Sequence, residues 1–312
     1  MSRKISFKEQ MFRALNALNC YGQSKYQAKK ESYKQGNKGK VKGIYSKKTM
    51  SDYKKVAEQF QSWSKNKGYN FKSLADVSDS HIIQYLKERQ DTGKSAWTIS
   101  RDLSALNKIF NREISKKGTD LKSRKNSDIK NNRGFGNNYR PSIYKKNKEL
   151  TEFLSATGIR RQSITVVSPA DAIRDGQGVV IGFSIIEKGG KPRNCYVIKD
   201  KQGAITSFVD NHQGKNGNQP FWSKADKNLN THWYRAEYAK TLYNDLVSAQ
   251  NNRQDYFNGY RDFFVNSSRL ELTTKRHNQT VKGYDVECLG VVSQCLGHNR
   301  IDVVYSNYLS RF

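Results

Sequence analysis

Four short stretches in the second half of the chain hold side chains that could act together on a phosphate ester. Guanidinium groups bind phosphate oxygens bidentately and stay charged, so arginines are the first candidates. Lysine, histidine and tyrosine can donate, accept or carry a proton beside them. The stretches are TGIRRQS with Arg160, EKGGKPR with Lys188, HWYR with His232 and Arg235, and LGHNRIDVVYSNY with His298 and Tyr308.

The charge of the chain indicates the kind of partner. The 312 residues include 56 Lys and Arg against 28 Asp and Glu, a formal net charge of +28. Self-repulsion on this scale is a disadvantage for an enzyme of small molecules, whereas a polyanion binder gains steering and counterion release from it. No apolar run approaches the ~18 residues of a membrane span, and no signal peptide is present. Nucleic acid is therefore the expected partner, and a membrane is not.

Cysteine and histidine spacing predicts neither a metal site nor a cofactor site. The four cysteines, Cys20, Cys195, Cys288 and Cys295, form no CxxC or Cys/His pattern, and reduced thiols are the expected state. The five histidines include no HExxH motif. We therefore expect no metal and no cofactor.

The elements that must position these residues begin with a helical region. Apolar residues recur at helical spacing between residues 48 and 113, for example Val56, Phe60 and Trp63, which predicts a small all-helical domain. Residues 1–45 precede it and are interpreted as a basic arm, with a merely solvated tail as the alternative. Residues 126–147, rich in Lys, Arg, Asn and Gly, are interpreted as a basic linker.

The region from residue 148 onward has a mixed pattern. Residues 178–200 read as two β-rich runs joined by a Gly-Gly turn, which predicts a hairpin. Helical segments are expected around WYRAEYAKTLYNDLVSAQ and at the C-terminus. A second domain, of α and β structure, is therefore predicted over residues 148–312.

Each of the four stretches is weak evidence alone, but their order is informative. In that order they resemble the catalytic set of the tyrosine recombinases, the phage-integrase or Xer/integrase-like family, and the resemblance covers roughly residues 48–312. It implies a mainly α fold with a small β-sheet. A SAM-like core-binding domain over residues 46–125 and an α+β catalytic domain over residues 148–312 would form a C-shaped clamp on DNA.

The resemblance also assigns roles to the cationic residues. Arg160 and Arg235 would bind the nonbridging oxygens of the scissile phosphate, where negative charge develops. His232 and His298 would donate hydrogen bonds there or exchange a proton with the nucleophile. Lys188, on the predicted hairpin, would protonate the leaving 5′-oxygen, with Lys191 in this role, or a structural role for the hairpin, as the alternative.

Two tyrosines compete for the role of nucleophile. Tyr305 and Tyr308 lie one helical turn apart and would share a helix face. The resemblance favours Tyr308, which would hold the 3′-phosphate covalently, and Tyr305 is then expected to pack or to contact DNA. Because the phosphotyrosyl bond keeps the energy of the phosphodiester, rejoining would need neither ATP nor metal.

The sequence departs from the family pattern at three places. The family commonly has an acidic residue three positions after the first arginine, where this chain has Ser163. Arg161 competes with Arg160 for the same role. The stretch from Arg235 to His298 is longer than in compact members, which implies an insertion around residues 240–286. Its aromatic segment YFNGYRDFFV would either pack into the protomer's own core or contact a second protomer.

The expected function is that of a site-specific DNA recombinase or integrase, most simply one that integrates or excises a mobile genetic element. A catalytically silent DNA-binding regulator and a Xer-type multimer resolvase are the alternatives. The expected partners are double-stranded DNA and three further copies of the chain, as a homotetramer on two synapsed sites. An accessory directionality protein is left open. The expected location is the prokaryotic cytoplasm, at the nucleoid.

Overall fold

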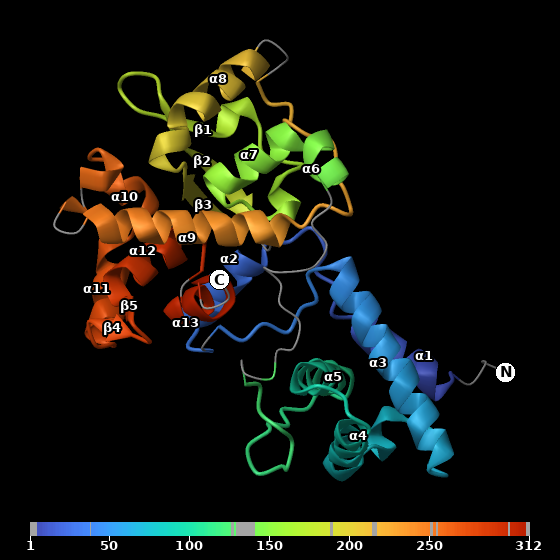
Figure 1. Cartoon of the computed structure of the whole chain (residues 1–312). Helices are drawn as coiled ribbons and strands as arrows, with labels where there is room; N and C mark the ends of the chain where they lie inside the picture. Colours follow the sequence, from blue (N-terminus) through green and yellow to red (C-terminus); the bar gives the residue numbers. More distant parts are fainter. Residues whose placement is uncertain are drawn as a thin grey trace. The chain divides into compact units, whose positions relative to one another are not determined.

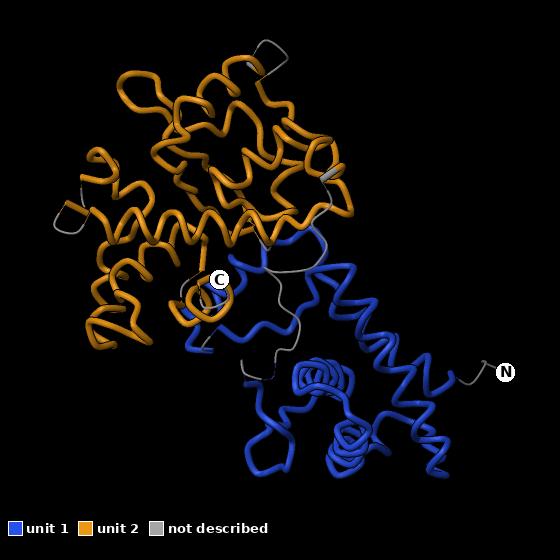
Figure 2. Tube along the Cα trace, viewed as in Figure 1, with its two compact units in different colours: residues 1–128 blue, residues 129–312 orange. Residues whose placement is uncertain are grey.

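The computed structural model describes residues 5–37, 39–125, 128, 141–187, 190–213, 217–249, 252–253, 255–298 and 300–309. The chain divides into two compact units, Met1–Asp128 and Ile129–Phe312 (Figure 2). The predicted basic linker falls partly on described residues, where the helix α6, Pro141–Lys146, lies within it. The rest of that prediction, apart from Asp128 and Asn147, lies outside the described residues.

The first unit is helical where it is described. Serine side chains cap several of its helices: the Ser46, Ser78 and Ser95 hydroxyls accept hydrogen bonds from backbone N–H groups of the first turn. These caps begin the helices that apolar spacing predicts. The elements are α1 Phe7–Asn16, α2 Lys25–Lys34, α3 Lys47–Asn66, the 3-10 helix η1 Leu74–Asp76, α4 Asp79–Asp91 and α5 Ala96–Ile109.

The core of the first unit includes a helix that the sequence assigned to the basic arm. Met11 and Leu15 of α1 are fully buried and belong to the same apolar cluster as Phe60 of α3 and Leu106 of α5. The chain also pairs Asn19 with Ile44 in an isolated parallel bridge. Although residues 1–45 are predicted as a basic arm, α1 packs with α3 and α5, because burying these apolar side chains is favourable.

The second unit is mixed, with most of its described residues in helices. The elements are α6; α7 Lys148–Thr157; η3 Arg161–Ser163; η4 Pro169–Asp171; β1 Ala172–Arg174; β2 Val180–Glu187; β3 Lys191–Tyr196; η5 Lys199–Lys201; α8 Gln202–Gln213; α9 Thr231–Ala249; η7 Asp255–Phe257; α10 Arg261–Phe264; α11 Ser267–Lys275; β4 Thr280–Val281; β5 Tyr284–Asp285; α12 Val286–Cys295; α13 Ile301–Val304; and a π-helix, Tyr305–Leu309. The predicted fold class, mainly α with a small sheet, is confirmed.

The main sheet of the second unit has the order β1-β2-β3, with antiparallel neighbours. β2 and β3 form the predicted hairpin, and their last pair joins Glu187 to Lys191. Successive residues of β3 enter different apolar clusters: Cys195 packs with Phe153 and Phe183, and Tyr196 packs with Tyr238 and the α12 side chains. The sheet therefore lies between two cores, as the alternation of side chains along a strand allows.

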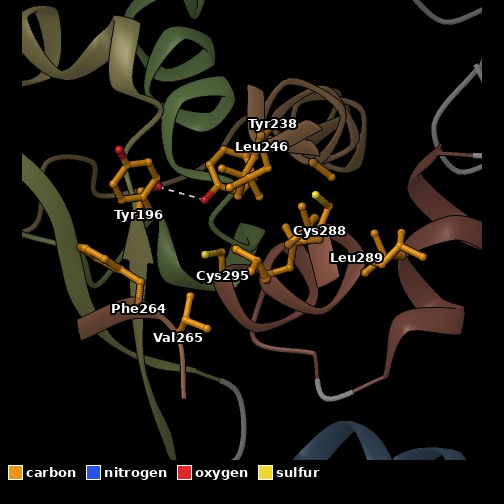
Figure 3. Close-up of a cluster of buried hydrophobic side chains, with 14 of the residues drawn as sticks. Tyr196, Tyr238, Leu246, Phe264, Val265, Cys288, Leu289 and Cys295 are labelled. Atoms are coloured by element: carbon orange, nitrogen blue, oxygen red, sulfur yellow. Dashed lines mark hydrogen bonds between the residues drawn. The ribbon is translucent and has the colours of Figure 1, made fainter. Parts of the chain in front are cut away.

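The helix α9 connects these cores to the C-terminal helices. It packs against α7 on one side and against α12 and the π-helix on the other (Figure 1). Tyr238 of α9 donates a hydrogen bond of 3.0 Å to the Tyr196 carbonyl (Figure 3). Gly158, which ends α7 with φ +59°, allows the close approach, since a Cβ there would lie 2.4 Å from the Tyr238 ring. α9 is thereby fixed against both the sheet and α7.

Residues 240–286, where an insertion relative to compact family members is expected, contribute side chains to this packing. Phe257, Phe264 and Leu270 are buried in the cluster that contains Tyr196 and Tyr238. Figure 3 shows Phe264 beside Tyr196. The aromatic segment thus packs mainly into the protomer's own core, the first of its two expected placements. Phe263 is the exception, with 56% of its surface exposed.

Candidate active site

The centre of the site is the turn that follows α12. Gly297 ends this helix with φ +67°, and a Cβ there would lie 2.5 Å from Arg193 Cδ. The last carbonyls of the helix, Cys295 and Leu296, accept hydrogen bonds from arginine side chains instead of from further helix. A helix C-terminus attracts cations because its carbonyl groups are unpaired and its dipole is negative there. Arginines therefore gather beside the LGH turn.

Arg235 is the most deeply buried of these arginines. It lies on α9, is 2% exposed, and donates to the Gly158 and Leu296 carbonyls and, at 3.2 Å, to the Tyr308 hydroxyl. Burial lowers the pKa of Arg235 to about 10, against the opposing effect of Tyr308. The guanidinium group stays charged at neutral pH, and its Cζ atom lies 5.9 Å from the centre of the Tyr308 ring.

Arg160 follows α7 and approaches the same turn from the other side. Its guanidinium group donates to the Glu187 carboxylate and, at 3.3 Å, to the Leu296 carbonyl. The side chain keeps 27% of its surface exposed, so an anion can reach it. Arg160 and Arg235 thus share one acceptor, the Leu296 oxygen, which places the two charges predicted to bind phosphate close together.

Arg161, the competing arginine, points elsewhere. Its guanidinium group donates to the Asp226 carbonyl at 2.7 Å and to the Leu229 carbonyl. These two acceptors lie in the segment that leads into α9. Arg161 therefore holds a loop, and the geometry favours Arg160 for contact with phosphate.

Tyr308 and His298, both predicted site residues, contact each other. His298 Nε2 lies 3.1 Å from the Tyr308 hydroxyl and 3.4 Å from an Arg235 nitrogen. Burial, followed by the charges of Arg235, Arg160, Arg193 and Lys191, lowers the pKa of His298 to about 3. The imidazole is therefore neutral at pH 7. Since Arg235 can only donate, the lone pair is assigned to Nε2, where it can accept the phenol proton.

Tyr305 occupies a different environment. Its ring lies 5.2 Å from the Lys282 ammonium group and packs at the edge of the apolar cluster. Tyr308 is 8% exposed and carries the contacts with Arg235 and His298. Both tyrosines belong to the π-helix, a rare element that is frequent at functional sites.

The sequence predicts two further site residues, His232 and Lys188. His232 lies one turn before Arg235 on α9, but its side chain is exposed. Lys188 lies outside the described residues. The structure thus brings together Arg160, Arg235, His298 and Tyr308.

Three further residues lie beside these four: Glu187, Arg193 and Lys191. Of these, the sequence suggested a role only for Lys191, as the alternative to Lys188. Glu187 ends β2, and Arg193 lies on β3 and binds both Glu187 and the Cys295 carbonyl. Lys191 begins β3; burial and the charges of Arg269, Arg160 and Arg193 lower its pKa. The signal was present in EKGGKPR, where an acid and three cations flank one turn, but the ion pairs depend on folding.

Comparison with known proteins supports the family resemblance. Residues 40–117 match the phage integrase N-terminal SAM-like domain. This match confirms, at the helical domain, the resemblance to the tyrosine recombinases of the phage-integrase family. No curated protein gives a significant match to the chain.

Two solved structures are similar to the chain over most of its length. One is XerH site-specific recombinase bound to difH substrate in a pre-cleavage complex, at 16% identity and a TM-score of 0.43, covering 98% of this chain and 87% of that one. The other is XerH bound to palindromic difH in a post-cleavage complex, at 16% identity and a TM-score of 0.42, covering 89% and 91%.

Two candidate features are absent from the described part of the chain. No three His, Cys, Asp or Glu side chains gather there in a group that could hold a metal ion. Likewise, none of the helices described has the length and apolar character needed to cross a membrane.

Proposed function

We propose that this protein is a site-specific DNA recombinase that cleaves and rejoins strands through a covalent 3′-phosphotyrosyl intermediate on Tyr308. The observation that carries the proposal is the position of the Tyr308 hydroxyl. It lies between a charged donor, Arg235 Nε at 3.2 Å, and a neutral acceptor, His298 Nε2 at 3.1 Å. A phenol in this arrangement can pass its proton to the histidine while the arginine stabilises the negative charge on its oxygen.

In the first step the Tyr308 oxygen attacks phosphorus and its proton passes to His298 Nε2. The new O–P bond forms as the bond from phosphorus to the 5′-oxygen breaks. Arg160 and Arg235 bind the nonbridging oxygens, on which charge accumulates. Rejoining is the same step in reverse, with the attacking 5′-hydroxyl of a partner strand displacing Tyr308. The energy of the ester is conserved throughout.

The leaving 5′-oxygen needs a proton, and a lysine of the β2–β3 hairpin supplies it. Lys188 is the donor that the family resemblance implies. Lys191 is a second candidate, because its lowered pKa eases the release of a proton. His232, whose side chain is exposed near the start of α9, would contact the DNA or its phosphate when substrate is bound.

The substrate is double-stranded DNA, which fits the net charge of +28. We propose that four copies act on two synapsed sites and that the reaction integrates or excises a mobile element, with resolution of multimers as the alternative. The SAM-like domain over residues 40–117 supports DNA binding by the first unit.

Relaxation of supercoiled plasmid carrying the element's own flanking DNA, in the presence of EDTA, tests the proposal. Relaxed products and a protein-linked strand are expected, because neither metal nor ATP enters the steps above. A catalytically silent regulator would bind this DNA and leave its topology unchanged. Relaxation that depends on divalent metal would indicate a nuclease mechanism.

A further inference from the structure

A buried carboxylate joins two arginines beside the proposed nucleophile. Glu187 is 5% exposed, and both of its oxygens are used. Oε2 accepts from Arg160, and Oε1 accepts from Arg193 at 2.7 and 3.1 Å. Arg193 in turn donates to the Cys295 carbonyl at the end of α12. One chain of contacts therefore links Arg160, the hairpin end and the turn that carries His298.

The charges show that Glu187 is ionised. Burial alone would raise its pKa, but the Arg193 and Arg160 charges, with their hydrogen bonds, bring the pKa below its ordinary value. Arg193 has only 4% of its side chain exposed, whereas Arg160 has 27%. Arg193 is thus an internal partner of the carboxylate, and Arg160 is the one that an anion can reach.

In this chain Ser163 occupies the position that is commonly acidic in the family, and it cannot form an ion pair with Arg160. Ser163 is 2% exposed, and its backbone N–H bonds to the Arg160 carbonyl. A serine hydroxyl carries no charge with which to orient a guanidinium group. The carboxylate that meets Arg160 comes from the end of β2 instead.

We infer that Glu187 is a positioning residue for Arg160, held in place by Arg193, and that it replaces the acidic residue absent at position 163. The inference rests on the proposed function. Glu187 fixes one edge of the Arg160 guanidinium group, so that the remaining N–H groups face the scissile phosphate in a single orientation. Such preorganisation costs no rearrangement at the moment of reaction.

The test uses the full chain and two nicked duplexes that trap the covalent product. One has an ordinary scissile phosphodiester. The other has a methylphosphonate, in which a neutral methyl group replaces one nonbridging oxygen and removes the charge that Arg160 would offset. Single-turnover cleavage rates and DNA dissociation constants are measured for wild type, Glu187→Gln, Arg160→Ala and the double variant. The control is Asp210→Asn, which removes the exposed carboxylate of the ion pair between Asp210 and Arg174 in the same unit.

Glu187→Gln is expected to slow cleavage of the phosphodiester by about 10²-fold, the scale of losing one oxyanion donor, with DNA binding unchanged. On the methylphosphonate the variant and the wild type should cleave at similar rates. In the Arg160→Ala background the second substitution should add little, because the two residues act as a unit. Asp210→Asn should behave as wild type on both duplexes.

An equal loss on both duplexes, additive with Arg160→Ala, would overturn the inference and leave Glu187 a structural role. If thermal melting shows that Glu187→Gln does not fold, Glu187→Asp takes its place. It keeps the charge but is too short to reach both arginines, and the same phosphodiester-selective loss is required of it. A wild type that forms no adduct with either duplex contradicts the proposed function itself, which separates the two failures.

Discussion

At the scale of single residues, the site depends on a neutral histidine. The pKa of His298 lies near 3, while an unfolded chain has the ordinary value of 6.5. Between these values the unfolded state binds a proton that the folded state does not. Lowering the pH from 6.5 toward 3 therefore favours unfolding, and the contribution of His298 to stability is fully present above pH 6.5.

The first prediction follows from this difference. His298→Gln should lose less stability than wild type as the pH falls from 6.5 toward 3, because glutamine binds no proton in either state. Thermal melting at pH 7 and pH 5 in matched buffers measures the difference. Equal acid sensitivity of the two proteins would show that His298 is not held neutral.

The second prediction concerns the proton of the leaving group. Alanine at the lysine that donates it should slow cleavage of ordinary DNA. The rate should recover when sulfur replaces the bridging 5′-oxygen, since a thiolate leaves without a proton. Lys188→Ala and Lys191→Ala, compared side by side on both substrates, identify the donor. If sulfur substitution restores the rate of neither variant, the two lysines act in DNA binding or in the structure of the hairpin and not as proton donors.

At the scale of elements, neighbouring aromatic residues of α10 differ in burial. Phe264 is 6% exposed and packs with Tyr196 and Phe257, whereas Phe263 is 56% exposed. Phe264→Ala should cost about 3–5 kcal/mol of stability because it leaves a cavity. Phe263→Ala should stay within about 0.5 kcal/mol, as exposed positions do. Urea unfolding of the pair measures both, and a similar loss in both variants would contradict this packing.

Local sequence patterns predicted those helices and strands whose own residues show a clear periodicity or turn motif. The spacing of Val56 and Phe60 gave the helical domain, and the Gly-Gly turn gave the β2–β3 hairpin. Phe7, Met11 and Leu15 also follow helical spacing, but nothing in the local sequence indicates that their helix joins a core formed by residues later in the chain. The placement of the aromatic segment within residues 240–286 could not be predicted for the same reason, since its aromatic residues pack against the distant residue Tyr196.

The site was predicted in part, for a related physical reason. Arg160, Arg235, His298 and Tyr308 lie in short motifs that can be read one by one, and the structure brings them together. Glu187 and Arg193 carry no motif, and their importance arises only when the hairpin meets the end of α12.

At the scale of the whole molecule, the net charge of +28 governs association with DNA. Each phosphate neutralised contributes a slope of ~0.9 to the dependence of log affinity on log salt. If two units contact the duplex, six to ten neutralised phosphates would lower the affinity about 10³–10⁵-fold between 50 and 200 mM salt. Fluorescence anisotropy with a labelled duplex measures the slope. A slope that matches one or two contacts would contradict an extensive DNA interface.

The central claim is that Tyr308 is the nucleophile, and covalent trapping on a nicked duplex tests it most directly. Wild type and Tyr305→Phe should form a protein–DNA adduct that survives denaturation, and Tyr308→Phe should form none while binding the duplex normally, because only the attacking oxygen is lost. Peptide mapping of the adduct should locate the linkage at Tyr308. An adduct that persists in Tyr308→Phe and disappears in Tyr305→Phe would contradict the account.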